Sequence, residues 1–100
     1  MADLSQIVGF DWDDGNRLKS TEKHSVSQAE AEQVFADIRL MVADDVKHRQ
    51  VEARFHAMGR TTDSRLLHVT FTLRQSLTRI RVISARNMNR KERAIYEQEA

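Results

Sequence analysis

The segment from Arg79 to Arg86 contains the residues whose types and spacing could do chemistry. It reads Arg-Ile-Arg-Val-Ile-Ser-Ala-Arg, with charged and aliphatic residues alternating at its start. A β-strand has a period of two, so Arg79 and Arg81 are expected on one face and Ile80 and Val82 on the other. Guanidinium groups stay charged and present a planar fork of donors, which suits phosphate. The pattern predicts either a phosphate-binding surface or a solvated outer sheet face.

Charge is unevenly distributed along the chain, although the net charge is only +1. The first fifty residues contain six Lys/Arg and ten Asp/Glu, which gives −4. The last fifty contain ten Lys/Arg and five Asp/Glu, which gives +5, and nine of these ten bases are arginine. The asymmetry indicates a basic working surface on the C-terminal half, unless the two halves neutralise each other in the fold.

Composition excludes several classes of function. A chain of 100 residues with 40% hydrophobic and 31% charged residues is typical of one soluble domain, spanning residues 1–100. No apolar run approaches the ~18–20 residues of a membrane span, and the N-terminus lacks a signal-peptide core, so we expect a cytoplasmic protein without a membrane partner. The absence of cysteine excludes disulfides and thiolate chemistry. The histidines form no HExxH-type pair, so neither a metal site nor a cofactor is expected.

Two helices are expected before the main sheet. Residues 7–12 are apolar and aromatic and predict a first strand, and Asp13 can cap a helix over residues 14–24. Ser27 to Glu30 is a capping box that starts a second helix. Apolar residues at helical spacing predict one buried stripe on it: Ala31, Val34, Phe35 and Ile38.

The remainder of the chain predicts a sheet followed by a helix. Residues 40–43 form a short strand candidate, and in 51–58 and 66–73 the odd-numbered residues are expected to face one way and the even-numbered residues the other. Residues 51–58, residues 66–73 and the arginine strand are expected to form an antiparallel meander of three sequential strands. Asn89 to Glu92 offers a second cap, for a helix ending near residue 98. The predicted fold is α+β, with an antiparallel β-sheet packed against two N-terminal helices and a short C-terminal helix.

These residues resemble the BrnT toxins of bacterial type II toxin–antitoxin pairs, whose fold is RelE-like. The similarity covers nearly the whole chain, and its most specific part is Ile80 to Arg86 followed by Glu92, Arg93 and Tyr96. Further matching positions are Phe10-Asp11-Trp12-Asp13, Lys23-His24, Val26-Ser27, Glu30, Val34-Phe35, Gly59-Arg60 and Leu66-Leu67. The resemblance implies a ribonuclease that cleaves RNA and stops translation. It also implies a BrnA-like antitoxin with a ribbon-helix-helix part, so that operator DNA is bound only through the toxin–antitoxin complex.

Three positions depart from the family pattern. Asn16 stands where the family usually has lysine, Ser20 where it has asparagine, and Ser25 where it has glycine. That glycine would close the first helix in a left-handed conformation, which a serine adopts at a cost of about 1 kcal/mol. The departures leave open the geometry around His24 and the level of activity.

Metal-free RNA cleavage uses the 2′-hydroxyl as nucleophile. The protein must remove its proton, stabilise a dianionic phosphorane and protonate the leaving oxygen. Under the resemblance the catalytic candidates are His24, Arg60, Arg81, Arg86 and Tyr96, and the RNA-binding candidates are Lys23, Arg79, Arg93 and Glu52. Structural alternatives stay open: Arg86 could pair with Glu92, His24 could be a cation at a helix C-terminus, and Tyr96 could pack the last helix onto the sheet.

Two other classes of function compete with the nuclease. The residues around Ser25 superficially resemble the turn of a DNA-binding helix-turn-helix. However, the following helix contains Glu30, Glu32 and Asp37 and no base before Arg39, and phosphate repels such a face. The other class is a catalytically inactive RelE-like domain that binds RNA or the antitoxin, which the three departures keep open.

Overall fold

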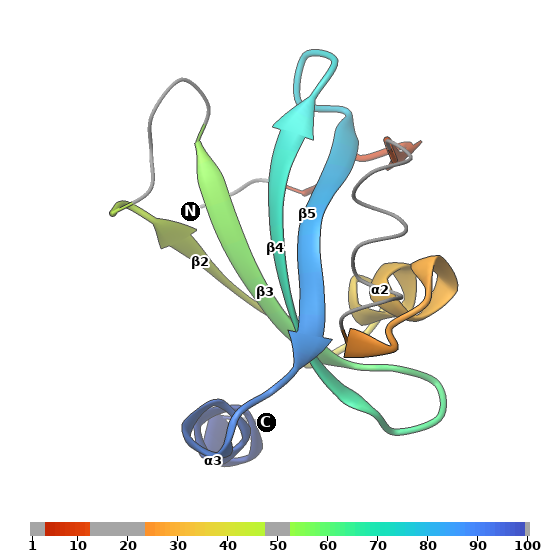
Figure 1. Cartoon of the computed structure of the whole chain (residues 1–100). Coiled ribbons are helices and arrows are strands. Elements are labelled where there is room, and N and C mark those ends of the chain that lie inside the picture. Colours follow the sequence, from red (N-terminus) through yellow and green to blue (C-terminus); the bar gives the residue numbers. More distant parts are fainter. Residues whose placement is uncertain (1–3, 13–23, 48–52, 100) are drawn as a thin grey trace.

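The computed structural model describes residues 4–12, 24–47 and 53–99. Its elements, in chain order, are β1 (Gly9–Phe10), α2 (Gln28–Val34), β2 (Met41–Asp45), β3 (Arg54–Arg60), β4 (Leu66–Arg74), β5 (Arg79–Asn87) and α3 (Arg90–Glu99). The strands form one five-stranded sheet in the order β1-β5-β4-β3-β2 (Figure 1). The α+β class is therefore confirmed. The predicted antiparallel meander of three strands is present as β3, β4 and β5. Strand β2 adds an antiparallel edge strand to β3, and β1 pairs with β5 in parallel, so the sheet is mixed.

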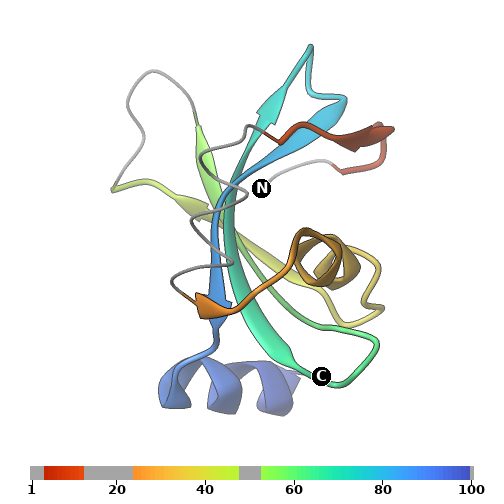
Figure 2. The same cartoon turned by 45° about the vertical axis from the view of Figure 1, so that its right-hand side comes forward.

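The helices are arranged differently from the prediction. In the described residues a single helix, α2, precedes β2, and α3 follows β5. The helix expected over residues 14–24 falls almost entirely on 13–23, which lie outside the described residues. The predicted cap of α3 is present, because Glu92 N donates to Asn89 Oδ1 at 2.8 Å and Asn89 N donates to Glu92 Oε1 at 2.9 Å. Helix α3 crosses one end of the sheet (Figure 2).

Helix α2 begins as predicted but ends early. Ser27 and Glu30 form the capping box. The helix ends at Val34, and Ile38, expected in the core, is 97% exposed. Residues 35–37 donate to carbonyls three positions back, which tightens the chain into a turn. Gly59 of β3 lies against this turn, since a Cβ there would be 2.8 Å from Val34 Cγ1.

The core lies between α2 and one face of the curved sheet, called the inner face below; the opposite face is the outer face (Figures 1 and 2). Its buried members are Val26, Ala31, Val34, Phe55, Ala57, Leu67, Val69, Phe71, Ile80, Val82 and Ala85. Phe35 packs edge-on against Phe71 and Phe10, with ring centroids 5.0 and 5.6 Å apart. The predicted odd-numbered face of β3 and β4 is thus the inner one.

A β-bulge in β5 changes which face its last residues occupy. Phe71 pairs with Val82 but Thr70 pairs with Ser84, so Ile83 is an extra residue without a partner in β4. The inner-face alternation therefore resumes at Ala85. Under strict alternation Arg86 would point into the core, whereas the bulge places it on the outer face.

Candidate active site on the outer sheet face

Arg86 of β5 and Glu92 of α3 form a bidentate ion pair. Arg86 Nη1 donates to Glu92 Oε1 at 2.8 Å and Arg86 Nη2 donates to Glu92 Oε2 at 2.9 Å. The hydrogen bonds from Arg86 lower the pKa of Glu92 to about 2, and the same contacts raise the pKa of Arg86. The structural pairing weighed for Arg86 is present, and it fixes a partly exposed guanidinium at the start of α3.

Two histidines stack on the outer face beside this pair. The rings of His56 on β3 and His68 on β4 have centroids 4.8 Å apart and an interplanar angle of 38°. His56 Nε2 lies 2.9 Å from Asp45 Oδ2, and His56 Nδ1 lies 3.0 Å from Thr70 Oγ1. Because both of its ring nitrogens have partners, the imidazole of His56 has a fixed orientation.

His68 is an uncharged group at neutral pH. It is 8% exposed, and this burial lowers the pKa of His68 to about 4. Glu92, whose Oε2 is 3.6 Å from His68 Nε2, opposes the decrease in pKa, whereas Arg86 and His56 add to it. The site therefore combines one neutral imidazole with a carboxylate that is ionised and paired.

A pocket of about 250 Å³ opens among these groups, between β2, β3, β4 and α3. Its lining residues are Met41, Val42, Ala43, His56, Met58, His68 and Glu92. Apolar walls with a few converging polar groups, one of them with a shifted pKa, are typical of small-ligand sites.

Asp37 joins three elements at the end of the sheet. Its Oδ2 accepts from Arg60 N at 2.8 Å and from the Tyr96 hydroxyl at 2.5 Å, and its Oδ1 accepts from Arg39 N at 3.0 Å. Burial opposes ionisation of Asp37, but these hydrogen bonds outweigh it and lower the pKa of Asp37. The carboxylate thus links the turn after α2 to β3 and α3.

A second pocket, of about 370 Å³, lies beside this junction. The exposed Arg39 and Arg60 line it together with Tyr96, which is 3% exposed. Burial and the hydrogen bond to Asp37 raise the pKa of Tyr96 to about 12. Tyr96 therefore keeps its proton at neutral pH, and its geometry favours packing α3 onto the sheet over proton transfer.

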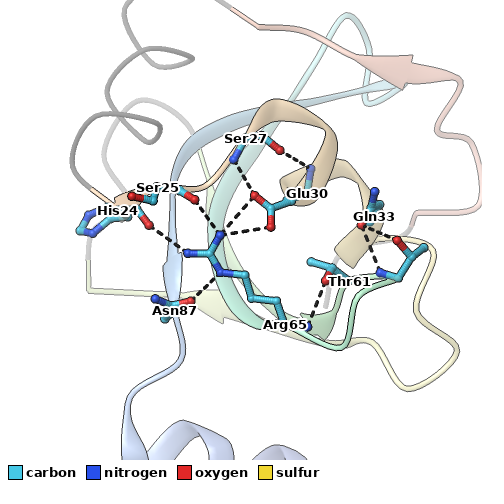
Figure 3. A network of polar contacts seen from close by, with 9 residues as sticks. His24, Ser25, Ser27, Glu30, Gln33, Thr61, Arg65 and Asn87 are labelled. Carbon is cyan, nitrogen blue, oxygen red and sulfur yellow. Dashed lines mark hydrogen bonds and ion pairs between the residues drawn. The ribbon is translucent and has the colours of Figure 1, made fainter.

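His24 lies in a different network, centred on Arg65 (Figure 3). Arg65 donates to the carbonyl oxygens of His24 at 3.0 Å and Ser25 at 2.6 Å, to the carboxylate of Glu30 at 3.1 and 3.2 Å, and to Asn87 Oδ1 at 2.9 Å. The imidazole of His24 points away from these contacts. The network uses the backbone of His24, and through Arg65, the residue before β4, it connects the segment before α2 to α2 and β5.

The other two arginines of β5 lie on the outer face further from α3. Arg81 pairs in register with Thr72, and Arg79 pairs with Arg74. Arg79 also lies against Gly9 of β1, where a Cβ would be 2.8 Å from Arg79 Nη1. The structure therefore brings the arginines of β5 onto one face, but along its length and not at a single point.

Of the remaining predicted residues, Arg93 is exposed on α3, and Lys23 and Glu52 lie outside the described residues. Sequence reasoning missed the stacked pair of His56 and His68. The pair could have been found in the sequence, because both histidines are at even-numbered positions of neighbouring predicted strands and therefore lie on the same sheet face.

Among residues 4–12, 24–47 and 53–99, no three His, Asp or Glu side chains converge in a way that could hold a metal ion. No helix in this part of the chain is long and apolar enough to cross a membrane.

Comparisons with known proteins identify a family and a similar solved structure. The model of the family "Ribonuclease toxin, BrnT, of type II toxin-antitoxin system" matches residues 12–92. The crystal structure of the Brucella abortus ribonuclease toxin BrnT is similar with a TM-score of 0.62 and 20% sequence identity, covering 83% of this chain and 99% of that chain. No curated protein matches the chain. At 20% identity the structural similarity supports the fold, and the family match supports membership.

Proposed function

The chain belongs to the BrnT family of ribonuclease toxins of type II toxin–antitoxin systems, and from this premise we propose that it is an endoribonuclease that cleaves RNA and inhibits translation in the cytoplasm. The family match over residues 12–92 carries the proposal, because it spans every element from α2 to the start of α3. Residues 1–100 would form a single RelE-like toxin domain.

The proposed reaction is attack of the 2′-oxygen on the adjacent phosphorus without a metal ion. The exposed guanidinium of Arg60 and the guanidinium of the half-buried Arg81 would stabilise the phosphorane, and Arg86, whose charge Glu92 balances, would contribute hydrogen bonds. Tyr96 would act by holding Arg60 in place through Asp37. His24 stays a candidate for proton transfer, and the candidates for contacts along the RNA are Lys23, Arg79, Arg93 and Glu52.

The proposed protein partner is a BrnA-like antitoxin with a ribbon-helix-helix part. Family membership supports this partner, because type II toxins are neutralised by a protein. Operator DNA would be bound only through the complex of the two proteins. Co-expression of a neighbouring ribbon-helix-helix protein should restore growth and co-purify with this chain.

Cleavage of a labelled RNA by the purified chain in excess EDTA tests the reaction. We expect cleavage to persist and to leave 2′,3′-cyclic phosphate ends, and we expect Arg81→Ala to lower the rate by about 100-fold or more. Arg90→Ala, an exposed substitution in the first turn of α3, is the matched control with an unchanged rate. Loss of cleavage on chelation, restored by magnesium, would show that the reaction needs a metal.

Expression in bacteria tests the toxin role. Induced wild-type protein should halt growth and Arg81→Ala should not. Unimpaired growth at confirmed soluble expression of the wild type would contradict the proposal.

A catalytically inactive module that binds RNA or the antitoxin is the second candidate. It is favoured by Arg86 and Tyr96, because both are already hydrogen-bonded within the chain. Binding of RNA at micromolar protein without any cleavage would support this candidate over the enzyme.

A further inference from the structure

The pocket between β2, β3, β4 and α3 has the size and lining of a site for a planar heterocycle. We propose that it binds a nucleobase of single-stranded RNA, with the sugar–phosphate chain following the arginines of β5. The inference rests on the proposed function and specifies how its substrate is bound.

The walls of the pocket suit a base. Its volume is about 250 Å³, and the side chains of Met41 and Met58 supply apolar and polarisable surface. The imidazole of His68 adds a flat ring, and unstacked RNA bases are recognised by stacking on such rings. These groups would bind any base by its face.

Glu92 supplies a polar group that could distinguish between bases. A carboxylate has about four lone-pair directions. Three are used, since Oε1 accepts from Asn89 N and Arg86 Nη1, and Oε2 accepts from Arg86 Nη2. His68 Nε2, at 3.6 Å, is too far from Oε2 for a hydrogen bond. One acceptor direction on Oε2 is therefore available to an amino or ring N–H of a base.

The pocket is organised before a ligand arrives. His56 is held by Asp45 and Thr70 and stacks on His68, so the imidazole wall cannot rotate freely. The uncharged state of His68 at neutral pH avoids placing a buried cation against the base. A preorganised wall lowers the entropic cost of binding.

The strand register places the pocket at a suitable distance from the arginines. Arg86 pairs with His68, His68 with Met58, and Met58 with Met41, so one row crosses the sheet from β5 to the edge strand β2. Neighbouring strands are about 4.8 Å apart, which puts β5 about 10 Å from β3. This separation is comparable to the span from a backbone phosphate to the far edge of its base. A phosphate beside Arg86 could therefore direct its base into the pocket.

Methionine methyl NMR tests the proposal, because the chain has only four methionines: Met1, Met41, Met58 and Met88. The full chain, labelled at these methyl groups, is titrated with 2′-O-methyl RNA oligomers of each base, which bind but cannot be cleaved. We expect the Met41 and Met58 signals to shift to an extent that depends on the base. Met88, which is 4% exposed and does not line the pocket, should not shift.

A pair of substitutions separates the pocket from the rest of the surface. Ala43→Trp fills the pocket from an exposed position on the edge strand, and we expect about 10-fold or more weaker oligomer binding, consistent with the loss of one stacked base. Val46→Trp is the matched control with unchanged affinity, because Val46 is 72% exposed and lies beyond the end of β2.

Several outcomes would overturn the nucleobase site. These are oligomer binding without movement of the Met41 and Met58 signals, equal affinities of the two tryptophan variants, or no binding of any oligomer. Shifts of these methyl groups produced by the purified antitoxin but not by RNA would assign the pocket to the antitoxin instead. Cleavage of unmodified RNA with unmoved methyl signals would contradict the pocket alone. Base-dependent shifts without any cleavage would contradict only the proposed enzyme.

Discussion

Ser25 has a φ of 54°, in the left-handed region that favours glycine. Its carbonyl oxygen accepts a 2.6 Å hydrogen bond from Arg65 Nη1, and Arg65 Nη2 binds the carbonyl oxygen of His24. The guanidinium therefore stabilises a backbone conformation that the serine side chain disfavours. At residue scale this is the clearest example of local strain offset by a tertiary contact.

Ser25→Gly should increase the free energy of unfolding by up to about 1 kcal/mol, because glycine adopts this φ without steric cost. Urea denaturation of both proteins measures the change. Ser27→Gly is the control of opposite sign: Ser27 is the N-cap of α2, so this variant should lose a few tenths of a kcal/mol. A lower free energy of unfolding for Ser25→Gly than for the wild type would contradict backbone strain at Ser25.

His68 should make the protein less stable in mild acid. Its folded pKa of about 4 lies below the ordinary value of 6.5, so between these pH values the unfolded chain binds a proton that the folded chain does not. The contribution of neutral His68 to the free energy of unfolding is fully present above pH 6.5. It is lost as the pH falls toward 4, and the loss is about 2–3 kcal/mol. Unfolding free energies measured from pH 7 to 4 should fall less in His68→Gln than in the wild type. The same decrease in the free energy of unfolding for His68→Gln and the wild type would contradict the lowered pKa of His68. His24→Gln is the control variant.

At the scale of elements, Asp37 connects the turn after α2 to β3 and α3. Tyr96→Phe removes one hydrogen bond and should cost about 1 kcal/mol of stability, and Asp37→Ala removes three and should cost about 2 kcal/mol or more. The double variant should cost less than the sum, because both changes break the same contact. Chemical denaturation of the four proteins measures the coupling. Additive costs would show that the Asp37–Tyr96 bond contributes nothing.

Strand β5 shows that a strand can be predicted from its sequence although the face occupied by its last residues cannot. The arginine strand and the alternation of β3 and β4 follow from a period of two in the sequence. The bulge at Ile83 has no such signature, because an extra residue is accommodated by the partner strand and not by the local sequence. Strict alternation would therefore have assigned Arg86 to the core.

On the scale of the whole molecule, the described residues show one ion pair between the acidic and the basic half and two exposed arginines. Glu30 of the acidic half pairs with Arg65 at 3.1 Å. Arg39 and Arg60 stay exposed beside one pocket. Exposed guanidinium groups thus lie beside a pocket although the net charge of the chain is only +1.

The salt dependence of RNA binding measures how many phosphates the protein contacts. If Arg60 contacts one phosphate, Arg60→Ala should reduce the slope of log affinity for 2′-O-methyl RNA against log salt concentration by about 0.7. Lys47→Ala, at an exposed position after β2, should leave the slope unchanged. Equal slopes for the wild type and Arg60→Ala would show that Arg60 contacts no RNA phosphate.

The amino-acid sequence by itself determined the local features of this protein: the capping boxes at Ser27 and Asn89, the alternating strands, the left-handed position at Ser25 and membership in the BrnT family. Family membership rests on a match over residues 12–92, and the other features depend on residues within a few positions of one another. Only the tertiary structure decided that α2 ends at Val34, that β1 joins the sheet in parallel, and that His56 and His68 stack beside the Arg86–Glu92 pair. Each of these depends on strand register and on contacts between distant segments, which local patterns do not encode.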